Sequence, residues 1–268
     1  MTSLTSSSKD VRYTTSIVKG AALVGEMQKL LENWQPSEPY DAFLERVQHQ
    51  DMLGKSTAYR TKDIVRRVFA RRLLIPTDEP ARLLKQIMQS NLPSSTFNEM
   101  LLVYSSRKDP LIHDFILQEF WPAVRSGRNI LDTDTVLTFL SGATYDGRID
   151  PPWSDNVELR VARSILGLLR DVGFLRETQR GRKEIVNYRI TDEGTVILAR
   201  ELYESGVSDS SLSEHQDWGL FGLSRTDVLD RLDGIGEERG LIVQRAGSVV
   251  RLTWFIRSME EMVNVLAR

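Results

Sequence analysis

Residues 154–194 read SDNVELRVARSILGLLRDVGFLRETQRGRKEIVNYRITDEG, and this stretch decides the fold class. Apolar residues recur at helical spacing through its first half, until Gly173 ends the pattern. Two strand patterns, 174–178 and 185–190, flank a turn rich in arginine and lysine, and Thr191 then opens another helix. Helix, basic hairpin, helix is the order of a winged helix, so we expect a winged-helix-like subdomain here.

The chain before Gly127 carries a succession of amphipathic helical patterns. Apolar residues recur in each at three- and four-residue spacing, and proline stands near several of the ends. The expected helices are 15–34, 40–50, 56–74, 80–90, 95–104 and 110–121. We therefore expect a helical bundle over residues 13–127, preceded by a disordered Ser/Thr-rich tail over residues 1–12.

A change of texture after Gly127 marks a subdomain boundary. A shorter helical pattern, 131–140, and a stretch rich in glycine and proline, 142–152, lead into the winged-helix pattern. The C-terminal part repeats the order of helix and hairpin, with a helix over 226–239, strands over 241–244 and 248–255 and a last helix over 259–267. We expect subdomains over 128–206 and 207–268, and a mainly α fold class with small β-hairpins.

Composition limits the classes of partner and site. The 268 residues have a formal net charge of −2, so a polyanion must be bound by local basic patches. The chain has no cysteine, which excludes disulfides and cysteine-bound zinc and fits a reducing compartment. Charged residues such as Lys19, Arg245 and Arg251 interrupt the most apolar windows, and residues 1–10 lack the apolar core of a secretory signal. We expect a cytoplasmic protein without a membrane span.

The best local signal for DNA lies on the helix expected after Ser154. Arg160, Arg163 and Arg170 share one face of it, and Gly167 between them leaves room for a phosphate. The hairpin adds further cations and two glutamates: Arg176, Arg180, Arg182, Lys183 and Arg189, with Glu177 and Glu184. A solvated helix and turn would look similar, but the excess of arginine favours bidentate phosphate contacts, so we prefer DNA binding.

The strongest charge run of the chain lies in and just before the helix expected over 56–74. Asp63 is the only acidic residue within it. Its cations are Lys55, Arg60, Lys62, Arg66, Arg67, Arg71 and Arg72. A phosphate-tracking surface, a protein interface and a salt-bridged face all fit this pattern, so the three interpretations stay open.

Patterns that resemble catalytic motifs have simpler interpretations. The sequence DPPW at residues 150–153 has the form of the amine-gripping motif of amino-methyltransferases, but no glycine-rich cofactor loop follows a strand upstream. The three histidines, His49, His113 and His215, have no second ligand at metal spacing. We therefore expect a protein that is not an enzyme and has no metal site or cofactor.

Longer motifs resemble those of the BrxA family of BREX bacteriophage-exclusion systems. In the first half they are LGKS at 53–56, Arg60, KDI at 62–64, RR at 66–67, DPL at 109–111 and DF at 114–115. Central motifs are GRIDPPWS at 147–154, RVAR at 160–163 and LRDVGFL at 169–175. Motifs near the end are DW at 217–218, AGSVVRL at 246–252 and SMEEMV at 258–263. The resemblance extends over nearly the whole chain.

This resemblance implies a cytoplasmic helical protein with affinity for double-stranded DNA and without catalytic activity. It also implies an N-terminal bundle similar to the antitermination factor NusB, with winged-helix character after it. The protein would act beside other BREX components, including a methyltransferase, an ATPase and a phosphatase-like protein. Two alternatives remain: a scaffold for defence proteins that does not contact DNA, and a transcriptional regulator that reads an operator with the helix after Ser154.

Overall fold

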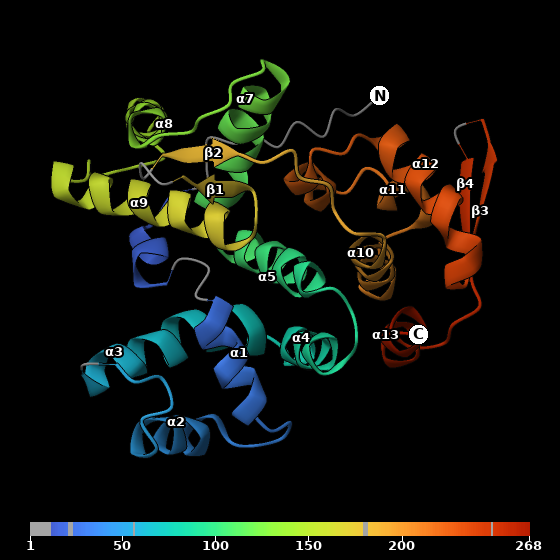
Figure 1. The fold of residues 1–268 in the computed structure, drawn as a ribbon, viewed down its shortest axis with the longest axis horizontal. Coiled ribbons are helices and arrows are strands. Elements are labelled where there is room, and N and C mark those ends of the chain that lie inside the picture. Colours follow the sequence, from blue (N-terminus) through green and yellow to red (C-terminus); the bar gives the residue numbers. More distant parts are fainter. Residues whose placement is uncertain (1–11, 21–23, 56, 179–181, 248) are drawn as a thin grey trace. The chain divides into compact units, whose positions relative to one another are not determined.

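The computed structural model describes residues 12–20, 24–55, 57–178, 182–247 and 249–268. This part of the chain is mainly helical with two small antiparallel hairpins, which confirms the expected fold class (Figure 1). The tail expected over 1–12 lies outside the described residues except for Arg12. No helix of the described part is long and apolar enough to cross a membrane.

The chain forms two compact units, each built from two stretches of sequence. Unit 1 comprises Met1–Leu23 and Ser105–Val186, and unit 2 comprises Val24–Tyr104 and Asn187–Arg268. These units interleave along the sequence, whereas the subdomains expected over 13–127, 128–206 and 207–268 are consecutive. The consecutive ranges stay a prediction about which segments fold together.

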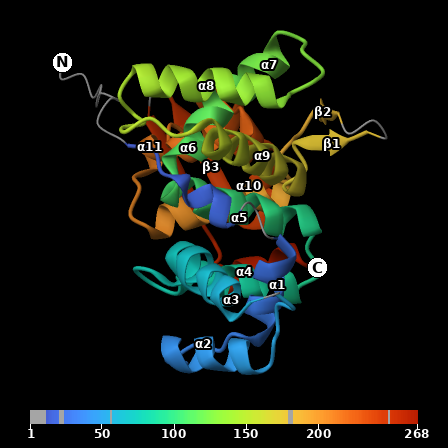
Figure 2. The ribbon, with the colours of Figure 1, turned by 90° about the vertical axis from the view of Figure 1, so that its left-hand side faces the viewer.

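Unit 1 consists of short helices, one long helix and a hairpin. In chain order they are η2 (Thr15–Lys19), α6 (Pro110–Phe115), η4 (Ile116–Phe120), α7 (Trp121–Arg125), α8 (Thr133–Tyr145), α9 (Asp155–Asp171), β1 (Leu175–Glu177) and β2 (Lys183–Ile185). The helices α8 and α9 lie side by side, and the hairpin follows the end of α9 (Figure 2).

Aromatic side chains form the centre of unit 1. Phe120 stacks on Phe174 with 4.9 Å between ring centroids, and Trp121 meets Phe174 edge-on at 6.0 Å. Phe115 meets Phe139 edge-on at 5.3 Å, which joins α6 to α8. Because aromatic rings bury large apolar areas, these contacts fix the helices around the hairpin.

Helix α9 forms where the spacing of apolar residues predicts it. Its apolar positions face inward, and Gly173 ends it in a left-handed conformation, with φ of +91°, that favours glycine. Ser154 occupies the N-cap position as expected, but its side chain makes no capping hydrogen bond.

Strand β2 is shorter than expected and lies between two partners. It pairs antiparallel with β1, and Ile130 forms an isolated antiparallel bridge with Glu184 on its other side. The amide of Leu131 donates to the carbonyl of Lys183 at 3.0 Å, which extends that second pairing. The strand expected over 185–190 therefore begins two residues earlier and ends at Ile185.

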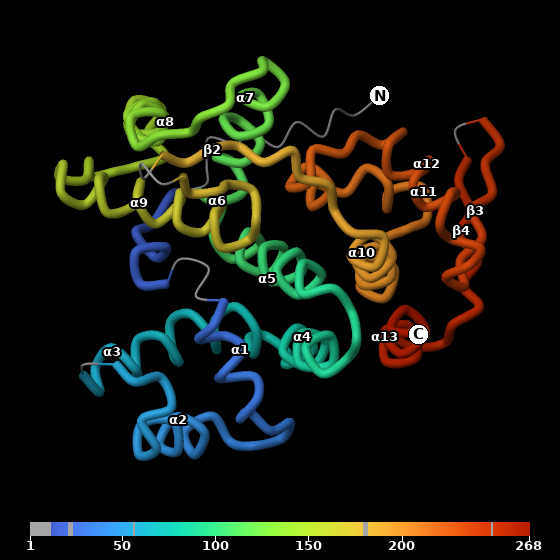
Figure 3. The backbone as a smooth tube through the Cα atoms, viewed as in Figure 1, coloured from blue at the N-terminus to red at the C-terminus, as the bar shows by residue number. Residues whose placement is uncertain are grey.

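Unit 2 holds most of the helices and the second hairpin. Its elements are α1 (Val24–Asn33), α2 (Tyr40–His49), α3 (Ala58–Asp63), η3 (Ile64–Leu74), α4 (Glu79–Gln89), most of α5 (Ser94–Lys108), α10 (Asp192–Glu204), α11 (Asp209–Leu212), η5 (Gln216–Phe221), α12 (Arg225–Gly236), η6 (Glu237–Arg239), β3 (Leu241–Ala246), β4 (Val249–Trp254) and α13 (Met259–Leu266). The backbone follows α3 into η3 as one helical path (Figure 3).

Two expected helices differ in the structure. The helix expected over 15–34 is interrupted, because Gly20 closes η2 with an extended backbone and α1 begins only at Val24. The helix expected over 56–74 changes its winding at Ile64, since η3 is a π-helix. The spacing of apolar residues did not predict either change.

Candidate nucleic-acid interface

The exposed face of α9 carries two arginines without partners. Arg160 and Arg163 are one turn apart and exposed, on the side opposite the buried residues of the helix. Neither guanidinium makes a hydrogen bond or ion pair within the described part of the chain. Gly167 follows one turn later, and a Cβ atom added there would meet nothing within 4 Å. This face can therefore receive a bulky anion without displacing an existing partner.

Arg170, the third arginine of this face, is already held by carboxylates. Its guanidinium donates to Asp171 at 2.7 Å and pairs with Glu177 at 3.4 Å. The hydrogen bond to Asp171 raises the pKa of Arg170, and Glu177 adds to that effect. The prediction that the three arginines share one face is confirmed. The sequence could not show that only two of them are unpaired.

The strands of the first hairpin neutralise most of their own charge. Glu177 lies opposite Lys183, and Arg176 lies opposite Glu184, so each cation has a carboxylate directly across the ladder. The hydrogen bond from Lys183 lowers the pKa of Glu177. The Arg182 side chain is exposed and has no partner within the described residues, whereas Arg180 lies outside them.

A polar cluster within unit 1 fixes the loop that leads into α9; we call it the Arg148 cluster (Tyr13, Asp114, Asp146 and Arg148). Arg148 is 8% exposed and donates to the Tyr13 hydroxyl at 2.5 Å and to Asp146 at 3.1 Å. Tyr13 donates in turn to Asp114 at 2.6 Å, and the Arg148 guanidinium lies over the Phe139 ring at 5.7 Å. The start of α9 is thereby tied to α6 and α8.

The second basic run lies on α3 and η3. Lys55 pairs with Glu26 at 2.6 Å, and Arg67 pairs with Asp63 at 3.1 Å. The remaining cations divide by exposure: Arg60, Lys62, Arg66 and Arg71 reach the surface, and Arg72 is buried. Arg72, although part of the same charge run in the sequence, is thus turned away from solvent. The side chains of Arg60, Lys62 and Arg66 make no hydrogen bond or ion pair in the described part of unit 2.

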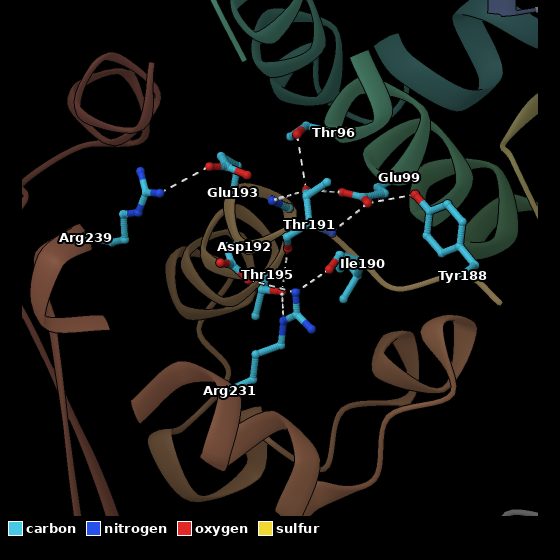
Figure 4. A network of polar contacts seen from close by, with 11 residues as sticks. Thr96, Glu99, Tyr188, Ile190, Thr191, Asp192, Glu193, Thr195, Arg231 and Arg239 are labelled. Carbon is cyan, nitrogen blue, oxygen red and sulfur yellow. Dashed lines mark hydrogen bonds and ion pairs between the residues drawn. The ribbon is translucent and has the colours of Figure 1, made fainter. Parts of the chain in front are cut away.

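A network in unit 2 shows how α10 begins (Figure 4). Thr191 caps the helix, and Glu99 accepts hydrogen bonds from the Thr191 amide at 2.8 Å and hydroxyl at 2.6 Å and from the Tyr188 hydroxyl at 2.7 Å. Burial raises the pKa of Glu99, and these hydrogen bonds oppose the rise. A helix N-terminus attracts anions, but here an internal carboxylate already occupies that position.

Two arginines of α12 and η6 belong to the same network. Arg231 donates to the Thr195 hydroxyl at 2.9 Å and to Asp192 at 2.8 Å, and it also bonds the Ile190 carbonyl. Arg239 pairs with Glu193 at 3.3 Å. These arginines stabilise unit 2, so substituting them would change its stability and could not serve as a control in a DNA-binding experiment.

Within the ranges that the structure describes, no three His, Asp or Glu side chains come together in a way that could hold a metal ion. His113 contacts Asp114 at 3.3 Å, and His215 contacts Asp217 at 3.4 Å. Each of these two histidines thus has one neighbouring carboxylate, and His49 is exposed.

A protein-family model matches residues 11–201, which is more than two thirds of the chain, and it is the model of BrxA. The chain belongs to the BrxA family. It is therefore a component of a BREX phage-defence system. The matched range includes the Arg148 cluster, the exposed face of α9 and the basic run of α3 and η3.

No curated protein matches the sequence of this BrxA-family chain. Among solved structures, an uncharacterized protein from Magnetospirillum magneticum is similar, with a TM-score of 0.55 and 19% identity. The alignment covers 73% of this chain and 96% of that one. At this identity the likeness shows a shared fold.

Sequence reasoning missed the residues that position the site. Tyr13 and Asp114 are 101 residues apart, and Glu99 and Thr191 are 92 residues apart, so no local spacing connects them. One signal was available for Arg148, since an arginine between Asp146 and Asp150 suggested an ion pair. Asp146 does pair with Arg148, whereas Asp150 pairs with Arg12 at 3.4 Å.

Proposed function

We propose that this BrxA-family chain binds double-stranded DNA through the exposed face of α9, as a non-catalytic accessory component of its BREX system. The observation that carries the proposal is the pair Arg160 and Arg163, both exposed and unpartnered beside the open position at Gly167. Arginine at such a position forms bidentate contacts with phosphate.

The order of elements in unit 1 supports α9 as the helix that enters a groove. The segment around Ile130 pairs with β2, then α8 and α9 follow, and β1 and β2 enclose a turn. In a winged helix the last helix before the hairpin is the recognition helix, and the hairpin turn reaches the backbone beside it. Arg182, at the end of that turn, is placed to add a phosphate contact.

The small number of unpaired cations determines how strongly the chain should bind DNA and how far salt should weaken the binding. Arg160, Arg163 and Arg182 can each replace one counterion of DNA, while Arg170 and Lys183 begin in ion pairs with Glu177. We therefore expect modest, salt-sensitive binding that is largely independent of sequence. The partners would be duplex DNA and the methyltransferase, ATPase and phosphatase-like components of the same system.

Equilibrium binding to two unrelated duplexes at low salt tests this proposal. The charge reversal Arg160→Glu/Arg163→Glu should weaken binding to both duplexes, because the new carboxylates repel phosphate. The matched control is Arg251→Glu/Arg257→Glu, which changes the net charge by the same amount at two exposed arginines of unit 2. Equal losses in the two double variants would overturn the assignment to α9, and no binding by the wild type would favour the scaffold alternative.

A further inference from the structure

Helix α3 presents a tyrosine to solvent. Tyr59 is 65% exposed near the start of that helix. Lys62 follows three residues later, on the same side of α3, and Arg66 follows seven residues later, just after the change of winding at Ile64. All three are exposed, and within the described part of unit 2 none of their side chains makes a hydrogen bond or ion pair. We call them the Tyr59 stripe.

The acidic residue of this segment does not neutralise the stripe. Asp63 is only 5% exposed and pairs with Arg67 at 3.1 Å. Arg60 lies next to Tyr59 in sequence, and its guanidinium makes no hydrogen bond or ion pair among the described residues. The stripe therefore combines a free aromatic face with a local excess of positive charge.

We propose that the Tyr59 stripe binds single-stranded nucleic acid, with an unpaired base stacked on Tyr59 and backbone phosphates on Lys62 and Arg66. The stripe extends over seven residues, which corresponds to roughly 10 Å at the rise of an α-helix. At about 3.4 Å per nucleotide of a stacked strand, that length suits about three nucleotides. Aromatic side chains beside cations are the usual means of binding unpaired strands.

The aromatic ring distinguishes an unpaired strand from a duplex. Bases in a duplex stack on one another and present only their edges in the grooves, so a tyrosine face has nothing to stack on. Phosphate contacts alone would need Lys62 and Arg66 but not Tyr59. The proposal therefore predicts a ligand preference that depends on the ring.

This inference does not rest on the proposed duplex site. The Tyr59 stripe belongs to unit 2, whereas Arg160 and Arg163 belong to unit 1, so each can fail without the other. A chain with both sites could hold a duplex and an unpaired strand together.

The experiment is fluorescence anisotropy of the full chain with a labelled oligothymidine of about 16 nucleotides, within the range of known single-strand site sizes. Tyr59→Ala should weaken binding by about 5- to 100-fold, in keeping with the effect of removing one stacked base. Tyr59→Phe should retain binding because it keeps the ring. The matched control is Tyr145→Ala, since Tyr145 is 93% exposed and is followed by Asp146.

Competition arms identify the ligand. Unlabelled single-stranded DNA or RNA should displace the labelled oligothymidine better than a duplex of the same length does. The charge reversal Lys62→Glu/Arg66→Glu should weaken binding of the oligothymidine, whereas Arg160→Glu/Arg163→Glu should leave it unchanged. Wild-type affinity in Tyr59→Ala, equal losses in Tyr145→Ala, or better competition by duplex would each overturn the proposal. Tyr59 is exposed, so circular dichroism should show unchanged folding in its variants.

Discussion

Glu177 pairs with Arg170 at 3.4 Å and thereby joins the end of α9 to the first hairpin. The same carboxylate pairs with Lys183 across the ladder. One acidic side chain thus holds two cations of the surface that we propose for DNA. Both ion pairs are present in the protein without DNA, so a phosphate must compete with Glu177 for each cation.

Glu177→Gln should strengthen duplex binding, because Lys183 would lose the carboxylate that competes with phosphate and Arg170 would keep only Asp171. The slope of log affinity against log salt should become steeper by about 1 to 2, according to whether one or both cations gain a phosphate. Titrations at several salt concentrations measure this slope. Glu260→Gln in unit 2 is the control for the change in net charge, and equal gains in both variants would show a nonspecific effect.

Two glycines within helices should respond oppositely to alanine. Gly167→Ala should raise the free energy of unfolding by about 0.5–1 kcal/mol, because its Cβ meets nothing and alanine favours the helix. In Gly194→Ala the Cβ would lie 2.0 Å from a Glu99 carboxylate oxygen and 2.9 Å from the Thr191 hydroxyl. This overlap should cost about 1–3 kcal/mol. Denaturant unfolding measures both changes, and a stabilised Gly194→Ala would contradict the network of Figure 4.

The pH dependence of stability should report on Glu99. Burial raises its folded-state pKa above the ordinary value of 4.5, so the folded state binds this proton more tightly than the unfolded chain does. That contribution is fully present below the unfolded pKa and is lost as pH rises through the raised folded pKa. The unfolding free energy of the wild type minus that of Glu99→Gln should therefore fall with rising pH above about 4.5. A difference that stays constant or increases would contradict the raised pKa.

The sequence was sufficient for the elements near the proposed site, because their signals are local. The periodicity of residues 154–172, the stop at Gly173 and the basic turn predicted α9 and β1 with boundaries close to those observed, and they predicted a second strand that in fact ends at Ile185. The C-terminal hairpin was predicted for the same reason, whereas the short helix α11 lacked a pattern long enough to recognise.

Features that depend on contacts between distant residues were not predictable. Even the near neighbours Asp171 and Glu177 could not be recognised as partners of Arg170, because proximity in sequence does not show whether two side chains pair. The Arg148 cluster likewise needs Tyr13, which is 135 residues away. Sequence therefore located the cations of the proposed interface, and the structure was needed to separate the unpaired ones from the rest.

The decisive measurement is the salt dependence of duplex binding by the wild type and by Arg160→Gln/Arg163→Gln. If both arginines contact phosphate, their neutral replacements should reduce the magnitude of the slope of log affinity against log salt by about 2. The slope should fall equally for unrelated duplex sequences, since phosphate contacts carry no sequence information. Identical slopes for the two proteins would contradict DNA binding through the exposed face of α9.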